Sequence, residues 1–503
     1  MIELRGVTER APEWDRLNQI TTRLAAKDAA LWGEKAEAEA KIRLDWVDLP
    51  KMSWELLPEL DALSAWSREI GHKNFILCGM GGSSLAPEVI AAAFGKNLIV
   101  LDATDPEQIV DALQIDLKST CIIIASKSGS TIETSSQRAL FENRLQEGGL
   151  DIRRHMVVIT DPDSPLDKSA RSQGLRVINA NPMVGGRFSA LSAFGLTPAA
   201  LLGIDVSVLL DDAFEAASKF LEPDSAPVRM AALLAKPNFQ FPRICDQGSN
   251  VPGIGDWIEQ LVAESTGKDG RGVLPVIVEQ PDSQTITFDG SSSISVIGEL
   301  GAQFIFWEWV TALTCYLIEV DPFNQPNVSE SKERTGKILE LWDRGELIES
   351  TPSFESENLA IYGEREFSSI NAALSELRGA ATGYLAIMAY LNRNKDFKVA
   401  ELRAKLEERF TLPTTFGWGP RFLHSTGQFH KGGPLVGSFL QITGEPSTSV
   451  AIPGSGFGFE RLVIAQALGD LDALRSRNLP TIRIHLKKRR EGISELLSAV
   501  EGL

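Results

Sequence analysis

Four short apolar runs between residues 73 and 180 constrain the fold more than any other feature of the chain. They are Phe75-Ile-Leu-Cys78, Leu98-Ile-Val-Leu101, Cys121-Ile-Ile-Ile124 and Met156-Val-Val-Ile159, and helix-like segments separate them. No polar residue alternates within a run, which is typical of strands that are buried on both faces. Such strands, alternating with helices, predict a doubly wound parallel sheet and therefore an α/β fold.

The chain has 503 residues, which is too many for one compact core. An apolar run from Phe304 to Ile318 contains Glu308 and is shorter than the ~20 residues that span a bilayer, so it predicts a buried helix. We expect four regions. They are a helical N-terminal arm (1–65), a first parallel-sheet domain (66–230), a second such domain (231–345) and an α/β C-terminal extension (346–503).

Composition excludes several classes of function. The 50 Lys and Arg residues against 67 Asp and Glu residues give a net charge of −17, which repels nucleic acid and anionic membranes. The four cysteines lie far apart, with no spacing that suits a disulfide framework or a metal site. The N-terminus carries no apolar signal segment. We therefore expect a cytoplasmic protein without metal, and an anionic substrate would need a local binding site.

The loop Ser126-Lys-Ser-Gly-Ser-Thr131 follows the third apolar run and precedes a helix predicted to begin near Ile132. Its hydroxyl groups and the backbone N–H groups of the helix N-terminus together form a cradle for an anion. A helix N-cap needs only one hydroxyl. The four hydroxyls therefore favour phosphate binding.

A glycine-rich loop, Gly79-Met-Gly-Gly-Ser-Ser84, follows the first apolar run in the same way. It lacks the third glycine of a dinucleotide-binding fingerprint and does not match a Walker A loop. Both loops are expected at the carboxyl ends of neighbouring parallel strands, where open α/β sheets bind their ligands.

Five motifs, in order along the chain, resemble those of glucose-6-phosphate isomerases, which have the sugar isomerase (SIS) fold. They are Gly79-Met-Gly-Gly-Ser-Ser-Leu-Ala-Pro87, Ser126-Lys-Ser-Gly-Ser-Thr-Ile-Glu-Thr134, Gly185-Gly-Arg-Phe-Ser189, Glu264-Ser-Thr-Gly-Lys268 and the stretch from Asp321 to Lys332. Two further stretches, 26–32 and 424–434, resemble the isomerase half of bifunctional transaldolase/glucose-6-phosphate isomerases. The resemblance implies that the two expected sheet domains are of the SIS type.

The implied activity is an aldose–ketose isomerisation of glucose 6-phosphate and fructose 6-phosphate through a cis-enediolate, with no cofactor. Two alternatives stay open. A non-catalytic sugar-phosphate sensor is favoured by the altered neighbourhood of Glu279, and disfavoured by the joint presence of Arg187, Gln325 and Lys332. An isomerase of another hexose phosphate, such as mannose 6-phosphate, fits Gly129, which stands where many members carry an aromatic residue.

The resemblance also implies roles for individual residues. Substrate binding would fall to Ser83, Ser126, Lys127, Ser128, Thr131, Gly186 and Gln325. Arg187 would stabilise the enediolate and Lys332 would assist ring opening. These roles agree with the chemistry, since moving a proton between two carbons needs a base and electrophilic support for an oxyanion.

Glu279 is the residue that the resemblance implies as the catalytic base. It lies in Leu274-Pro-Val-Ile-Val-Glu-Gln-Pro281, where the family has a Gly-Glu-Pro turn, so the position agrees but the neighbours differ. Read without the resemblance, Glu279 is an ordinary surface glutamate at a strand end. Glu264 is the reserve candidate, although it suits the role of orienting other groups better.

The histidine that opens the sugar ring is displaced along the chain. No histidine lies between Glu279 and Gln325, where shorter family members keep theirs. His430, in a His-Lys-Gly-Gly-Pro loop, is the preferred candidate and His424 follows it. His72 and His485 lie beside predicted strands and are expected to be structural.

The expected partner is a small sugar phosphate, and the resemblance leaves open a homodimer or a fusion or association with a transaldolase. The roughly 65 residues before the first sheet cannot hold a transaldolase barrel of ~250 residues, so we expect no transaldolase activity in this chain. Dimeric relatives take a histidine from the partner subunit. If His430 acts within its own chain, a monomer would be active.

Overall fold

The computed structural model describes residues 1–344, 346 and 351–503, and these residues form two compact units. Unit 1 comprises Met1–Asp102 and Ile115–Gln325, whereas unit 2 comprises Ala103–Gln114 and Pro326–Leu503. The chain enters unit 2 twice, first for the short helix α7 (Pro106–Leu113) and again for its C-terminal part. The division into four regions expected from the sequence stays a prediction.

The first sheet of unit 1 has five parallel strands in the order β3-β2-β4-β5-β6. The strands are β2 (Asn74–Gly79), β3 (Ile99–Leu101), β4 (Thr120–Ala125), β5 (Met156–Thr160) and β6 (Arg176–Asn179). The four apolar runs coincide with β2 to β5, and every residue of β4 and β5 is buried. The predicted parallel α/β sheet is therefore confirmed.

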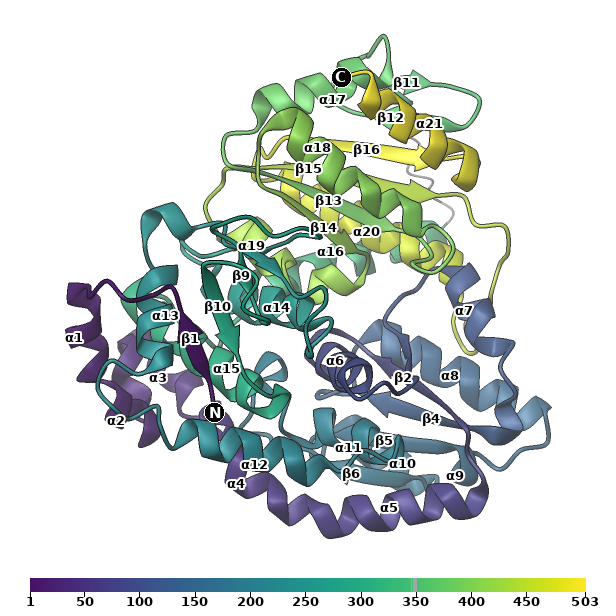
Figure 1. Ribbon diagram of the computed structural model, residues 1–503. Coiled ribbons are helices and arrows are strands. Elements are labelled where there is room, and N and C mark those ends of the chain that lie inside the picture. The colour runs from purple at the N-terminus through teal and green to yellow at the C-terminus, as the bar shows by residue number, and fades with distance from the viewer. Residues whose placement is uncertain (345, 347–350) are drawn as a thin grey trace. The chain divides into compact units, whose positions relative to one another are not determined.

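Helices cover both faces of this sheet. The side chains of α5 (Leu57–Ile70) and α11 (Ala193–Leu201) share an apolar cluster with one face of β2, β4, β5 and β6. On the opposite face α8 (Ile132–Glu147) lies along β2 and β4, while α10 (Pro165–Ser172) contacts β5 and β6 (Figure 1). Helix α6 (Leu85–Ala93) follows β2 after a short 3-10 turn, as a doubly wound connection requires.

A second, smaller sheet in unit 1 has the strand order β1-β10-β9-β7-β8. Its strands are β1 (Glu3–Arg5), β7 (Arg243–Cys245), β8 (Val276–Ile277), β9 (Ile286–Thr287) and β10 (Ile294–Ile297). All pairs are parallel except β1, which runs antiparallel to β10. The predicted helical arm does contain α1 (Pro12–Asn18), α2 (Thr21–Ala25), α3 (Glu34–Ala40) and α4 (Leu49–Met52), but it begins with an edge strand.

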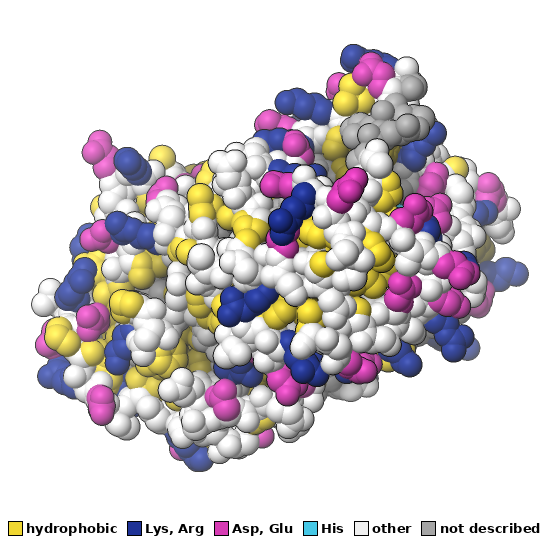
Figure 2. Space-filling model, turned by 90° about the horizontal axis from the view of Figure 1, so that it is seen from above, with side chains coloured by type: hydrophobic (Ala, Val, Ile, Leu, Met, Phe, Trp, Pro, Cys, Tyr) yellow, Lys and Arg dark blue, Asp and Glu magenta, His cyan; other side chains and the backbone are white. Residues whose placement is uncertain are grey.

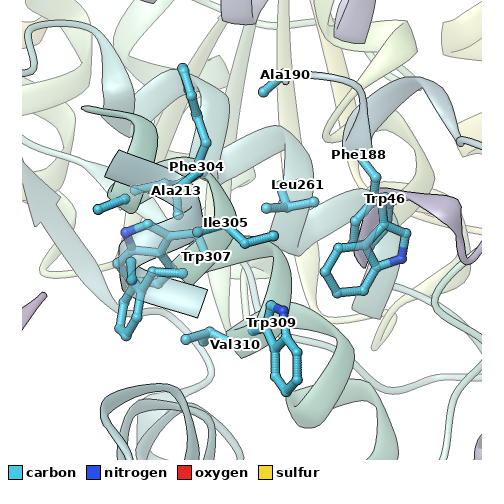
Figure 3. Close-up of a cluster of buried hydrophobic side chains, with 14 of the residues drawn as sticks. Trp46, Phe188, Ala190, Ala213, Leu261, Phe304, Ile305, Trp307, Trp309 and Val310 are labelled. Atoms are coloured by element: carbon cyan, nitrogen blue, oxygen red, sulfur yellow. The ribbon is translucent and has the colours of Figure 1, made fainter. Parts of the chain in front are cut away.

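Helix α15 (Leu300–Leu317) is the centre of the core of unit 1, as its apolar run predicts. Every residue from Leu300 to Cys315 is buried, which is the pattern of a helix that is apolar on all sides. It packs against α12 (Val206–Ala217), α13 (Ala226–Leu234) and α14 (Ile254–Thr266). Figure 3 shows Trp307, Trp309 and Phe304 projecting from it in different directions. In the part of the chain that the structure describes, no helix has the length and apolarity to cross a membrane.

Unit 2 is built on a six-stranded sheet in the order β11-β12-β16-β15-β13-β14. Its strands are β11 (Phe354–Glu355), β12 (Leu359–Tyr362), β13 (Tyr384–Tyr390), β14 (Thr414–Trp418), β15 (Gly437–Gly444) and β16 (Thr481–Leu486). The four strands β13 to β16 are parallel, and β11 and β12 are antiparallel additions. The C-terminal part therefore has the α/β fold predicted for it.

The two faces of this sheet differ in character. One face is apolar and packs against α17 (Ile370–Ala380), α18 (Leu402–Phe410) and α21 (Arg489–Glu501). The residues that alternate with that apolar set, such as Gln441 on β15 and Arg483 on β16, face the other way. Helices α16 (Pro326–Asp343), α19 (Gly427–Gly432) and α20 (Phe459–Arg475) contact one another on that side.

Charged side chains of both signs are mixed over the face of the protein drawn in Figure 2. On that face, the acidic residues that give the chain its net charge of −17 do not form one continuous acidic patch. An anion would have to be bound by a local arrangement of donors.

Candidate active site

The serine loop between β4 and α8 is held by bonds among its own hydroxyl groups. Ser126 Oγ accepts from the Gly129 N–H at 3.1 Å and donates to Thr131 Oγ1 at 3.3 Å, while Ser128 Oγ lies 2.8 Å from Ser130 Oγ. Thr131 is the N-cap of α8, and its side chain makes no capping bond. Helix α8 begins at Ile132, so the predicted helix start is confirmed. The first backbone N–H groups of α8 face the serine loop, where an anion would bind.

Lys127 in this loop is bound to the protein itself. Its Nζ forms an ion pair with Asp161 Oδ2 at 2.7 Å and donates to the Pro182 carbonyl at 3.2 Å. Burial lowers the pKa of Lys127 and raises the pKa of Asp161. The pair ties the serine loop to the end of the adjacent strand β5. Sequence reasoning missed Asp161, since its pairing depends on β4 and β5 being neighbours.

The glycine loop contacts a second turn that lies about a hundred residues away in the chain. The 3-10 helix η4 (Gly81–Ser83) packs against the 3-10 helix η6 (Gly186–Phe188). A Cβ atom on Gly82 would lie 2.0 Å from the Gly186 carbonyl oxygen, so this close approach requires glycine. The structure therefore brings the predicted site residues Ser83 and Gly186 together, and Ser83 is buried.

Arg187 on η6 joins three distant segments of unit 1. Its Nε donates to Ser265 Oγ at 2.8 Å, and its Nη1 donates to Glu264 Oε1 at 2.9 Å and to Gln325 Oε1 at 3.0 Å. Its Nη2 donates to the carbonyls of Pro322 (2.5 Å) and Asn324 (3.1 Å). Ser265 is a contact that the sequence did not suggest, although the motif 264–268 contains it.

Arg187 lies in a buried environment. The side chains of Arg187 and Glu264 are only 4% and 10% exposed, and the second Glu264 oxygen accepts from Gln260 Nε2 at 3.2 Å. Lys268 is buried beside them and donates to the Asp321 carbonyl. Burial, and then the nearby charge of Arg187, lower the pKa of Lys268 to about 7. Sequence reasoning gave Lys268 no role.

Glu279 belongs to the same unit but lies in a different environment. It is an exposed residue two positions after the end of strand β8. Its charge contributes to the raised pKa of Cys245 on the neighbouring strand β7, after the larger effect of burial. The assignment of Glu279 as the base stays a prediction.

The remaining candidates, Lys332, His424 and His430, lie in unit 2. Lys332 is exposed on α16, and His424 is half-buried in the 3-10 helix η9 (Arg421–His424). His430 on α19 is only 3% exposed, and its Nδ1 lies 2.9 Å from Tyr384 Oη, with the two rings stacked. Burial, and then the charge of Lys431, lower the pKa of His430 to about 3. Its imidazole is therefore neutral at physiological pH.

The described ranges 1–344, 346 and 351–503 contain no group of three or more His, Cys, Asp or Glu side chains that could hold a metal ion. All four cysteines are buried as free thiols.

The parallel sheets, and the loops gathered at the ends of their strands, have the α/β fold of the sugar isomerase (SIS) type. A crystal structure of a glucose-6-phosphate isomerase from Chlamydia trachomatis has the same fold, with a TM-score of 0.53 at 18% identity over 65% of this chain and 85% of that one. The model of the phosphoglucose isomerase family matches residues 63–241. The matched part of the chain includes the serine loop, the glycine loop and the Arg187 turn.

Curated relatives extend the comparison. A glucose-6-phosphate isomerase of Thermus thermophilus is 38% identical over 240 residues, which are 45% of this chain and 56% of that protein. One from Mycoplasmopsis pulmonis is 26% identical over 384 residues, 59% of this chain and 90% of the relative. The chain spans about half the length of several of the curated relatives that it matches.

Proposed function

We propose that this protein interconverts glucose 6-phosphate and fructose 6-phosphate by moving one proton through a cis-enediolate. The observation that carries the proposal is Arg187, a buried guanidinium held by Glu264 and Ser265 and placed beside the glycine loop. A fixed cation in a dry site stabilises a developing oxyanion without reorganising as the charge appears. The relatives named glucose-6-phosphate isomerase support the same reaction.

In this proposal the serine loop binds the substrate phosphate. Ser126, Ser128 and Thr131 supply hydroxyl groups, and α8 supplies backbone N–H groups and the positive end of its dipole. Lys127 lies in the same loop, where its ion pair with Asp161 fixes the loop in place. Ser83 and Gly186 line the sugar, and Gln325 holds a sugar hydroxyl.

Glu279 is the proposed base. A general base must reach the proton that it removes, and Glu279 is exposed at a strand end. Glu264 fits this role less well, because its two carboxylate oxygens already accept from Arg187 and Gln260. We assign Glu264 the task of holding Arg187.

Ring opening is proposed to use a histidine with Lys332. Both His430 and His424 are candidates, and their surroundings differ. His430 is bonded to Tyr384 inside the core of unit 2, whereas His424 is half-buried. The variants His430→Asn and His424→Asn show which histidine opens the ring. Loss of that histidine slows turnover of the cyclic sugar, whereas the open-chain form still reacts.

We propose a cytoplasmic protein that needs no cofactor, acts on a small sugar phosphate, and works alone, as a homodimer or together with a transaldolase. Sedimentation of the purified chain during turnover distinguishes an active monomer from an active dimer.

The test is the conversion of fructose 6-phosphate in EDTA, coupled to glucose-6-phosphate dehydrogenase. Wild type is compared with Glu279→Gln and with Glu9→Gln, an exposed glutamate of the N-terminal segment. We expect wild-type activity, a fall of about 10²–10⁴-fold in kcat for Glu279→Gln, and no change for the control. Undiminished activity in Glu279→Gln would place the base elsewhere.

Two other outcomes identify the alternatives. Phosphorus NMR of the product mixture separates glucose 6-phosphate from mannose 6-phosphate, and a mannose product would define a different hexose specificity. Calorimetric binding of fructose 6-phosphate without any turnover in the wild type would indicate a sensor.

A further inference from the structure

Unit 2 contains a cavity of about 620 Å³ that no part of the proposed isomerase mechanism uses. Its walls are formed by α16, α20 and the strands β12 and β16. This volume is in the usual range for sites that bind small molecules. None of the candidate residues for the isomerase reaction lines it.

Arg483 is the residue that makes the cavity unusual. It projects from the middle of β16, opposite Tyr362 of β12, and its guanidinium carbon lies 3.8 Å from the centre of the Tyr362 ring. The residue is only 8% exposed. Its Nε has no hydrogen-bond partner in the described part of the chain, and no carboxylate there forms an ion pair with it.

A buried guanidinium without a counter-ion is costly, and its environment reflects this cost. Burial lowers the pKa of Arg483, the charge and the hydrogen bond of Tyr362 oppose this shift, and the nearby positive charge of Arg475 adds to it. Arg475 Nε donates to Thr481 Oγ1 at 3.0 Å, and desolvation lowers the pKa of Arg475, although the charges of Glu364 and Asp472 oppose this shift. Two like charges therefore line the same cavity.

Of the three acidic residues that line the cavity, Glu330 and Asp472 pair with other bases, and Glu333 is exposed. Glu330 Oε1 accepts from Arg334 at 2.8 Å and Glu330 Oε2 from Arg477 at 2.6 Å. Asp472 also pairs with Arg334. Asp472 and Glu364 also stabilise the charge of Arg475, whereas no carboxylate of the described residues forms an ion pair with Arg483.

We infer that this cavity binds the phosphate group of a small phosphorylated molecule, with Arg483 and Arg475 as its ligands. Adjacent guanidinium groups present several N–H donors to one anion, which suits the charge and acceptor number of a phosphate. Ile338 and Leu341 of α16 and Leu468 and Leu471 of α20 line the same cavity and contact the organic part. The inference does not depend on the isomerase reaction.

The test is hydrogen exchange of the full chain, read peptide by peptide, at constant ionic strength set with chloride. The probes are inorganic phosphate, ribose 5-phosphate and adenosine monophosphate. We expect each probe to slow exchange in α20 and β16, and we expect one of the two organic phosphates to bind more tightly than inorganic phosphate. Exchange in the serine loop and α8 reports separately on the phosphate site of the proposed isomerase.

Three variants locate the ligands. Arg483→Met and Arg475→Gln remove one guanidinium each, and Arg461→Gln changes an exposed arginine of α20 that does not line the cavity. Affinity at α20 and β16 should fall at least tenfold in the first two and stay unchanged in the third. Arg475 is exposed, so its variant keeps the test valid if Arg483→Met does not fold.

The inference is overturned by any of three results. One is that phosphate slows exchange only in the serine loop and α8. Another is that Arg475→Gln binds each probe at α20 and β16 as tightly as the wild type. The last is that neither organic phosphate binds there more tightly than inorganic phosphate.

Discussion

Replacing Arg187 by methionine tests the structural argument most directly. The substitution removes five hydrogen bonds that reach Glu264, Ser265, Gln325 and the carbonyls of Pro322 and Asn324. Methionine has a similar length and is apolar, so the cavity left behind is small. The main consequence is a buried Glu264 carboxylate without its counter-ion.

The size of the effect follows from this burial. Breaking a buried ion pair by removing one partner costs about 3–5 kcal/mol, because the remaining charge stays uncompensated. The Arg187 and Glu264 side chains are only 4% and 10% exposed, so solvent does little to reduce this cost. In the double variant Arg187→Met/Glu264→Gln the orphaned charge is gone. We therefore expect it to recover at least about 1 kcal/mol relative to Arg187→Met.

The assay is urea unfolding followed by tryptophan fluorescence. Trp46 is a suitable reporter, because its ring lies 5.1 Å from that of Phe188, the neighbour of Arg187. The control is Arg144→Met, which breaks an exposed ion pair with Glu147 and should cost less than about 1 kcal/mol. The reasoning is refuted if Arg187→Met loses no more stability than this control, or if the double variant is less stable than Arg187→Met.

Three further predictions concern the same unit. Gly82→Ala places a Cβ atom 2.0 Å from the Gly186 carbonyl oxygen, so we expect the free energy of unfolding to fall by about 1–3 kcal/mol in denaturation experiments. We also expect a large fall in kcat/KM in the coupled assay, and an unchanged kcat/KM would contradict this prediction. Lys127→Ala breaks the partly buried ion pair with Asp161, so we expect a lower Tm and a higher KM for fructose 6-phosphate. An unchanged Tm would show that the ion pair does not stabilise the fold. The pKa of Lys268, about 7, lies below its ordinary value of 10.5, so between these values the unfolded chain holds a proton that the folded chain has released. The stability of wild type relative to Lys268→Met should therefore rise with pH over that interval, by up to about 1.4 kcal/mol per pH unit, in urea titrations at several pH values; a flat or falling difference would contradict it.

Much of the fold follows from local sequence patterns. The apolar runs predicted β2 to β5, and the run from Phe304 to Ile318 predicted the buried helix α15. The position of the serine loop between a strand and a helix start was also predictable. Periodicity and capping act over a few residues, so neighbouring residues are enough to reveal them.

The short strands of the second sheet in unit 1 could not be predicted in the same way. Strands β8 and β9 pair over only two residues each, so they carry too little pattern to stand out. Strand β1 is formed by polar and apolar residues that pair with β10, nearly 300 residues later. Such strands exist because a distant partner is present.

The connections that make a site depend on packing alone. Arg187 meets Glu264 and Gln325 across 77 and 138 residues, and Lys127 meets Asp161 because their strands are neighbours. The burial of His430 and the unpaired Nε of Arg483 likewise arise from helices that cover one face of the unit 2 sheet. Local sequence fixes which residues form strands, helices and loops. Charge pairing and burial depend on which distant segments the packed core brings into contact.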